Sequence, residues 1–212
     1  MTESTRESAV VLFDWNGTVV LDADRAQGSL NSVLHRRGLP RLDADGFARE
    51  FHLPMRHMFE RLGASDTAAA EREWNHEMTA KTTAAREGTD TLRALALAGT
   101  RLGVVSAAAA GSVHTDMNAL GLDDIWDSVD APAPDKIAVL RAGRGNETHA
   151  YYFGDTVYDM QSARAAGYTP IAVDRGYTDT GILRQAGATA VLTTFDELPS
   201  VLAHPMTTTQ RR

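Results

Sequence analysis

The sequence predicts an α/β fold, with a doubly wound, parallel, Rossmann-like sheet as its core and an all-helical segment inserted near the N-terminus. From residue 89 onward, short apolar runs alternate with helical patterns, which is typical of parallel βαβ units. Between residues 22 and 88 no strand pattern occurs, so this stretch is expected to be a separate helical unit. We therefore predict a core of residues 1–21 and 89–212 and a helical domain of residues 22–88.

Composition excludes several classes of function. The formal net charge of −7 argues against a nucleic-acid surface. The chain has no cysteine, hence no disulfide and no thiolate metal site, which fits a reducing compartment. No apolar run has the length of a membrane span, and the first residues lack the apolar part of a signal peptide. We expect a cytoplasmic protein without nucleic-acid or membrane partners; the oligomeric state is not predicted.

Apolar runs, glycines and prolines locate the remaining elements. In the insertion, the third helix is expected to start at Ser65 or Asp66 and to reach Gly88. The other expected helices are 23–38, 43–62 interrupted by Pro54, 90–98, one ending at Gly121, 135–142, 157–166, 179–186 and 196–203. The expected strands are 10–13, 101–106, 125–129, 150–153, 170–173 and 188–192. Residues 1–8 and the tail from Pro205 are expected to be loose.

Polar side chains follow three of the predicted strands. Asp14, Ser106 and Asp155 each stand where an apolar strand ends, and Asp159 lies in the first turn of the next helix. Because the carboxyl ends of parallel strands share one sheet edge, these side chains are expected to converge. Lys136, one of two lysines in the chain, stands at the start of a helix after a proline-rich turn.

Clustered carboxylates repel one another unless a cation lies among them, and oxygen ligands are those that Mg²⁺ prefers. Each residue alone also has an ordinary structural interpretation. Asp155 and Asp159 could cap a helix, Ser106 could simply end a strand, and Lys136 could be a solvated charge. The coincidence of all of them favours a magnesium site.

Four segments resemble the motifs of the haloacid dehalogenase-like hydrolase superfamily. Residues 14–18 (DWNGT) match its DxDxT motif except at the second Asp. Ser106 ends an apolar strand as in the second motif, Lys136 matches the third, and residues 154–159 (GDTVYD) match the fourth, GDxxxD. The helical insertion resembles the type-1 cap of this superfamily, and phosphoglycolate-phosphatase-like members are the most similar.

This resemblance implies a phosphatase that acts on a small phosphorylated metabolite through an aspartyl-phosphate, with Mg²⁺ as cofactor. Asp14 would be the nucleophile, with Asn16 and Lys136 the other catalytic residues. The implied metal ligands are Asp14, the backbone oxygen of Asn16, and Asp155, with Asp159 a ligand or a residue behind the ligands. The implied phosphate-binding residues are Trp15, Asn16, Ser106, Ala107 and Lys136.

Asn16 departs from the family pattern, because an amide cannot protonate a leaving group or activate water. Several interpretations stay open: an engineered change, a leaving group that needs no proton, another proton donor, or a binding or regulatory protein with weakened catalysis. The NH₂ group of Asn16 could also orient a leaving group or water. Dehalogenation is disfavoured by the intact GDTVYD, and phosphonate cleavage would require Lys81. A second departure is Ala131, which stands where some members have the lysine of a KPxP turn.

Substrate choice would depend on the helical cap. Arg56 and His57 follow Pro54, where a helix break could direct them to the crevice, and Arg56 could hold a second anionic group. A surface helix face is an equally good interpretation, and His52 and His76 are weaker candidates. Cap closure would use hinges near residues 20–22 and 88–89.

Overall fold

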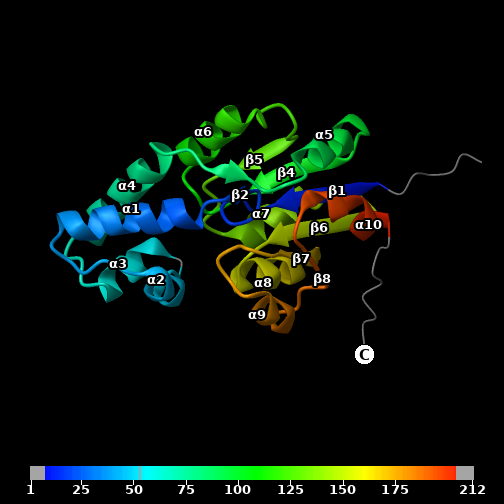
Figure 1. Ribbon diagram of the computed structural model, residues 1–212. Helices are drawn as coiled ribbons and strands as arrows, with labels where there is room; N and C mark the ends of the chain where they lie inside the picture. The colour runs from blue at the N-terminus through cyan, green and yellow to red at the C-terminus, as the bar shows by residue number, and fades with distance from the viewer. Residues whose placement is uncertain (1–7, 53, 204–212) are drawn as a thin grey trace, which may run out of the picture.

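The protein, described here by a computed structural model over residues 8–52 and 54–203, contains a six-stranded parallel sheet in the order β5-β4-β1-β6-β7-β8 (Figure 1). The first strand is central, and the chain builds outward from it on one side and then on the other, which makes β1 the switch point of the sheet. The predicted doubly wound fold is confirmed. The strands of this sheet are β1 (Ala9–Phe13), β4 (Arg101–Val105), β5 (Ser128–Asp130), β6 (His149–Gly154), β7 (Thr169–Val173) and β8 (Ala190–Leu192).

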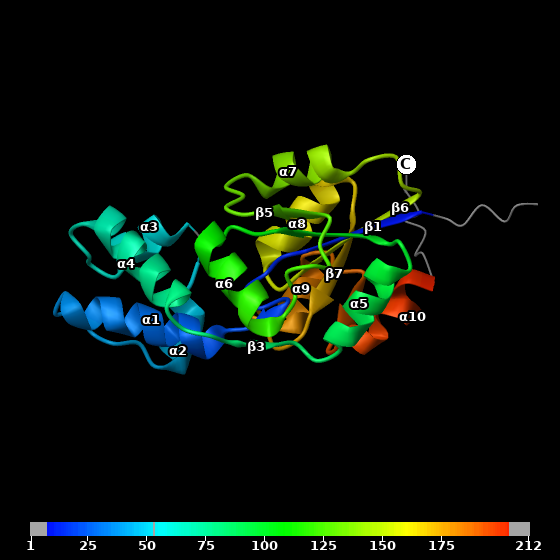
Figure 2. The same cartoon turned by 90° about the horizontal axis from the view of Figure 1, so that it is seen from above.

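Helices cover both faces of the sheet (Figure 2). Val11 and Phe13 of β1 pack in one apolar cluster, and Val10 and Leu12 pack in the other, on the opposite face. Because β1 is buried on both sides, its sequence is continuously apolar and does not alternate. One face carries α5 (Thr89–Leu97), α6 (Ala110–Leu120) and α10 (Leu198–Ala203); the other carries α7 (Lys136–Gly143), α8 (Val157–Ala166) and α9 (Thr180–Gln185).

The helical cap has its own apolar core and lies beyond the carboxyl end of β1 (Figures 1 and 2). Pro54 separates two of its helices, as predicted, and Asp66 caps the last one by accepting from the amide of Ala69 at 2.9 Å. Tyr177, from the core loop after β7, packs against the cap cluster. The cap helices are α1 (Ala23–Arg36), α2 (Ala44–Glu50), α3 (Met55–Arg61) and α4 (Thr67–Thr79).

Two predictions for the insertion are wrong. The last cap helix ends at Thr79 rather than near Gly88, and the chain then forms β3 (Ala84–Ala85), although no strand was expected there. This short strand pairs antiparallel with β2 (Val20–Leu21), so the two linkers between cap and core run side by side. A two-residue strand carries too little pattern to be recognised, because its pairing depends on a segment far away in sequence.

The other elements lie close to their predicted ranges. The strand expected at 125–129 is shifted to Ser128–Asp130, and the helix expected at 196–203 begins as a 3₁₀ turn, Phe195–Glu197. The expected loose segments, apart from Ser8, lie outside the described residues. In the part of the chain that the structure describes, no helix combines the length and the apolar character that crossing a membrane requires.

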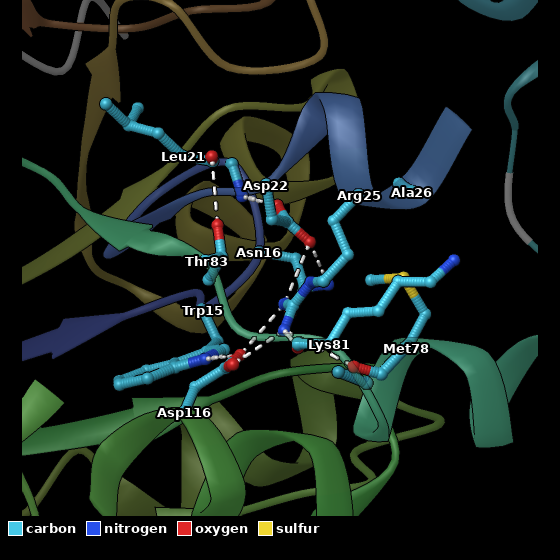
Figure 3. A network of polar contacts seen from close by, with 12 residues as sticks. Trp15, Asn16, Leu21, Asp22, Arg25, Ala26, Met78, Lys81, Thr83 and Asp116 are labelled. Carbon is cyan, nitrogen blue, oxygen red and sulfur yellow. Dashed lines mark hydrogen bonds and ion pairs between the residues drawn. The ribbon is translucent and has the colours of Figure 1, made fainter. Parts of the chain in front are cut away.

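A buried ion pair ties the cap to the core. Arg25 of α1 makes a bidentate contact with Asp116 of α6, at 2.6 and 2.8 Å. The indole nitrogen of Trp15 also donates to Asp116, at 3.1 Å, and Arg25 contacts Asp22 at 3.2 Å (Figure 3). Arg25 and Asp116 are 7% and 1% exposed, so their charges depend on each other for compensation.

We expect Asp116→Ala to lower the free energy of unfolding by about 3–5 kcal/mol, because the buried Arg25 would lose its main partner. Asp124→Ala is the matched control: Asp124 pairs with Arg93 while its side chain is 74% exposed. The control should cost less than about 1 kcal/mol. Urea unfolding of both variants measures the difference, and equal costs would show that the Arg25–Asp116 contact does not stabilise the fold.

Candidate active site

The sheet brings the strand-end residues together at its switch point. Asp14 continues β1, and its amide donates to the carbonyl of Phe153 in β6 at 2.8 Å. Ser106 and Asp155 end the two strands on either side, β4 and β6. Ligand oxygens of Asp14, Asp155 and Asp159 all lie within 4.8 Å of one another, in a buried position. The predicted convergence of these carboxylates is confirmed.

Lys136 connects two of the carboxylates. Its ammonium lies 3.0 Å from Asp14 Oδ1 and donates to Asp159 Oδ1 at 2.7 Å, and its side chain is 2% exposed. It is therefore not a solvated charge. Lys136 is the first residue of α7, whose cap Asp135 accepts from the amide of Ala138, so the helix start aims the lysine at the crevice.

Burial of these charges shifts their pKa values. Desolvation raises the pKa of Asp14 to about 6, although Lys136 and a hydrogen bond from Ser106 lower it. Desolvation, with the charges of Asp14 and Asp159, raises the pKa of Asp155 well above its usual value. Burial lowers the pKa of Lys136, but Asp14 and Asp159 outweigh it and hold the pKa well above its usual value. One ammonium does not compensate the whole cluster.

Asp159 combines a structural and a charge-related role. Its Oδ2 accepts from the amide and hydroxyl of Thr156, the residue that caps α8, while its own amide donates back to the Thr156 hydroxyl. Its Oδ1 accepts from Lys136 and, at 3.3 Å, from Tyr152. The structural interpretation of Asp159 as a helix-capping residue is thus correct but incomplete. Since protein donors occupy both oxygens, Asp159 is placed to orient Lys136.

Asp155 has free coordination capacity. Each of its oxygens accepts one protein hydrogen bond, Oδ1 from the hydroxyl of Thr18 at 3.1 Å and Oδ2 from the amide of Tyr177 at 2.7 Å. A carboxylate offers about four lone-pair sites, so others remain. Gly17, with φ +72°, packs against this carboxylate, and a Cβ there would collide with Asp155 and the Tyr177 ring. The glycine of the DWNGT segment is thus required by close approach.

The donor set fits Mg²⁺. Asp14 and Asp155 are buried carboxylates with raised pKa values, and a divalent cation between them would offset both their repulsion and their desolvation. Hard oxygen ligands are those that this ion takes. The fit rests on the chemistry and spacing of these oxygens.

Two of the expected phosphate-binding residues have side chains with no free polar group for a phosphate. Trp15 is fully buried, donates to Asp116 and packs against Trp126. Ala107 has no polar side chain, so both could contribute only backbone amides. Ser106 is 2% exposed, and its hydroxyl accepts from the amide of Ala108 at 3.3 Å.

Sequence reasoning missed three residues that shape the site. Asp22 accepts from the Asn16 side chain, Tyr177 donates from its hydroxyl to Asp22, and Arg86 donates to the carbonyls of Gly17 and Thr18. Arg86 is 1% exposed, and burial lowers its pKa to about 10. Of the three, only Asp22 could have been found from the sequence, because Arg25 follows it at the spacing of a helical ion pair. Tyr177 and Arg86 come from distant segments of the chain.

The structure does not bring the predicted cap residues into the cluster. Arg56 and His57 are exposed on α3, and no hydrogen bond or ion pair within the described residues joins either to the strand-end side chains. Their role in substrate choice stays a prediction. Lys81, the residue that phosphonate cleavage would need, forms an ion pair with Glu77 at 3.0 Å.

Comparison with known proteins agrees with this site. The model of a family described as haloacid dehalogenase-like hydrolase matches residues 11–173, which include the strand-end residues and the cap. The chain belongs to this family. The membership predicted from the four short motifs is thereby confirmed, and with it a hydrolase with the predicted α/β core.

Relatives of this hydrolase include named phosphatases. A phosphoglycolate phosphatase of Mesorhizobium japonicum is 26% identical over 92% of this chain and 94% of its own length. A predicted phosphoglycolate phosphatase from Haemophilus somnus superposes with a TM-score of 0.79 at 16% identity, covering 94% of this chain and 100% of that one. CbbY from Rhodobacter sphaeroides, solved in complex with phosphate, has a TM-score of 0.73 at 21% identity and covers 89% and 95%.

The raised pKa of Asp14 predicts how the stability of the metal-free hydrolase depends on pH. The folded state, with a pKa of about 6, binds the Asp14 proton more tightly than the unfolded state at 3.8. Stability from this group is therefore present below about pH 4 and lost as pH rises through 6. In chelator, the unfolding free energy of the wild type minus that of Asp14→Asn should fall by about 2–3 kcal/mol between these limits.

Urea unfolding at a series of pH values measures this difference. Asp24→Asn makes the same chemical change at an exposed position two residues beyond Asp22 and should show no such trend. Added Mg²⁺ should stabilise the wild type near neutral pH, since a ligand that binds only the folded state stabilises it. A difference independent of pH would show that Asp14 titrates normally.

Proposed function

We propose that the protein is a Mg²⁺-dependent phosphatase that hydrolyses a small phosphorylated metabolite through a phosphoryl group carried on Asp14. The observation that carries this proposal is the buried pairing of Asp14 with Lys136 beside Asp155. It supplies a nucleophilic carboxylate next to positive charge, and phosphoryl transfer depends mainly on positioning and charge compensation.

In the first step, a carboxylate oxygen of Asp14 attacks phosphorus, and the bond from phosphorus to the leaving oxygen breaks. In the second, water attacks the same phosphorus, the bond from phosphorus to the Asp14 oxygen breaks, and a proton of the water passes to the released phosphate or to solvent water. Lys136 binds phosphoryl oxygens and compensates their charge in both steps, while Asp159 keeps the ammonium in place. The hydroxyl of Ser106 and the backbone amides of Trp15 and Ala107 would hold the remaining oxygens.

Mg²⁺ would be held by Asp14, Asp155 and the backbone oxygen of Asn16. Asp159 would support this site indirectly, because it binds the ammonium of Lys136. When bound, the ion compensates charge on the phosphoryl oxygens. The raised pKa of Asp155 supports its assignment as a ligand, because this carboxylate lacks a full countercharge from the protein.

Asn16 restricts the substrates. Without a proton donor at this position, the leaving oxygen departs as an anion unless it carries its own acid. General acid–base help is worth roughly 10²–10⁴-fold, so substrates with poor leaving groups should be slow. Acyl phosphates and aryl phosphates need no proton. The Mesorhizobium relative is named for phosphoglycolate. Because of this likeness, phosphoglycolate also belongs in the substrate panel, as an alkyl phosphate with a poor leaving group.

A second candidate function is a phosphate-compound binding or regulatory protein with weakened catalysis, and Asn16 is the observation that favours it. Turnover of acetyl phosphate and p-nitrophenyl phosphate separates the two, because both have good leaving groups. If the wild type hydrolyses both compounds no faster than the Asp14→Asn variant does, the result would support the binding or regulatory protein.

The cytoplasmic location and the absence of nucleic-acid partners stay predictions.

Activity on acetyl phosphate should require Mg²⁺ and should be inhibited by Ca²⁺, which is larger and less strictly octahedral. The measurement is phosphate release in chelator, with each ion added back. Full activity in excess chelator would contradict a metal-dependent mechanism.

Asp14→Asn should lose at least about 100-fold in kcat on acetyl phosphate, because only the carboxylate can form the acyl-phosphate. Asp24→Asn, exposed and outside the crevice, should keep the wild-type rate. An Asp14→Asn variant that retains more than about a hundredth of the wild-type rate would show that another group is the nucleophile.

A further inference from the structure

The side chain of Asn16 is held in one orientation. Its Nδ2 donates to Asp22 Oδ2 at 2.7 Å. Its Oδ1 is buried and makes no hydrogen bond within the described residues. One of the two N–H groups of the NH₂, which the sequence suggested for orienting a leaving group or water, is therefore used at Asp22, and the amide oxygen is the buried atom that has no partner.

Asp22 fixes the orientation of the Asn16 amide because its carboxylate accepts the hydrogen bond from Asn16 Nδ2. It is 1% exposed and receives hydrogen bonds from the Gly17 amide at 2.9 Å, the Tyr177 hydroxyl at 2.9 Å and Arg25 at 3.2 Å. A flipped amide would place Asn16 Oδ1 against a carboxylate oxygen, exchanging a charge-assisted hydrogen bond for a repulsive contact.

Asp22 is itself held by both parts of the molecule. It directly precedes cap helix α1, and Arg25 links it to Asp116 of the core, which also accepts from Trp15 (Figure 3). Tyr177 reaches it from the core loop after β7. The orientation of Asn16 thus depends on a network that joins the cap to the loop carrying the nucleophile.

We propose that Asp22 is a positioning residue: it holds the Asn16 amide so that Oδ1 accepts a hydrogen bond from the water that hydrolyses the Asp14 phosphoryl group. This inference rests on the proposed function. A buried acceptor without a partner costs free energy, which a bound water or hydroxyl would recover. The amide oxygen orients such a group but takes no proton from it. The site therefore has a hydrogen-bond acceptor without acid–base function at the position where the family motif has a carboxyl group.

The first test needs no turnover. The side-chain amide of Asn16 is assigned by NMR from the signal that Asn16→Asp removes, and its hydrogen exchange is compared with that of Asn146, an exposed residue. The wild type should show slow exchange at Asn16. In Asp22→Asn the exchange should accelerate about 10-fold or more, as expected for loss of a charge-assisted hydrogen bond, while Asp24→Asn should leave it unchanged.

Fast exchange at Asn16 in the wild type would overturn the proposal even if Asp22→Asn does not fold. Unchanged protection in a folded Asp22→Asn would also overturn it. Because these readouts do not involve catalysis, they remain decisive if the protein turns over no phosphate ester, so failure of the proposed function is seen separately.

The second test exchanges donor and acceptor. In Asn16→Asp alone, the new carboxylate faces that of Asp22 across the 2.7 Å contact. In the double variant Asn16→Asp/Asp22→Asn, the amide at position 22 can donate to the carboxylate at position 16, so the contact is restored with reversed polarity. The double variant should hydrolyse alkyl phosphates roughly 10-fold faster than Asn16→Asp, with the change in kcat rather than KM. Equal kcat in the two variants would show that Asp22 does not position this side chain.

Discussion

The site depends on the compensation of buried negative charge by Lys136. The ammonium lies between Asp14 and Asp159 in a position almost closed to solvent. Without it, the carboxylates at the switch point would face one another uncompensated, which desolvation makes unfavourable. Much of the local structure serves this arrangement: the turn before α7 aims the lysine, and the capping box of α8 fixes the carboxylate that receives it.

A single ammonium still leaves the cluster short of positive charge. Burial, together with the repulsion between the carboxylates, raises the pKa values of Asp14 and Asp155, and a divalent cation that binds with a phosphate group would offset both effects. Stability and function are therefore opposed at this sheet edge. The fold keeps carboxylates together at some cost in stability, and binding of the proposed Mg²⁺ would offset that cost.

The sequence predicted the parts of the site that follow from the sheet. Asp14, Ser106 and Asp155 each end a continuous apolar run, and in a parallel sheet that information is enough to place them at one edge. The inner strands of the core were predicted for the same reason, since burial on both faces leaves an apolar run that is visible in the sequence. The core helices were predicted from the helical patterns between these runs and from the glycines and prolines at their ends.

Contacts between distant segments could not be predicted in this way. The pairing of β2 with β3, the position of Arg86 against the carbonyls of Gly17 and Thr18, and the contact of Tyr177 with Asp22 all depend on the packing of the cap on the core. Asn16 shows the consequence. Its identity marked a departure from the family motif, but only the structure shows which end of its amide is occupied.

The most direct test of this account is the mass of the protein quenched in acid during turnover of acetyl phosphate with Mg²⁺. An amide at position 16 leaves the attacking water without a base, so hydrolysis of the intermediate should be slow, and much of the protein should carry one phosphoryl group, mapped by peptide mass spectrometry to Asp14. Steady release of phosphate with no phosphoryl group on Asp14 at any quench time would contradict the account.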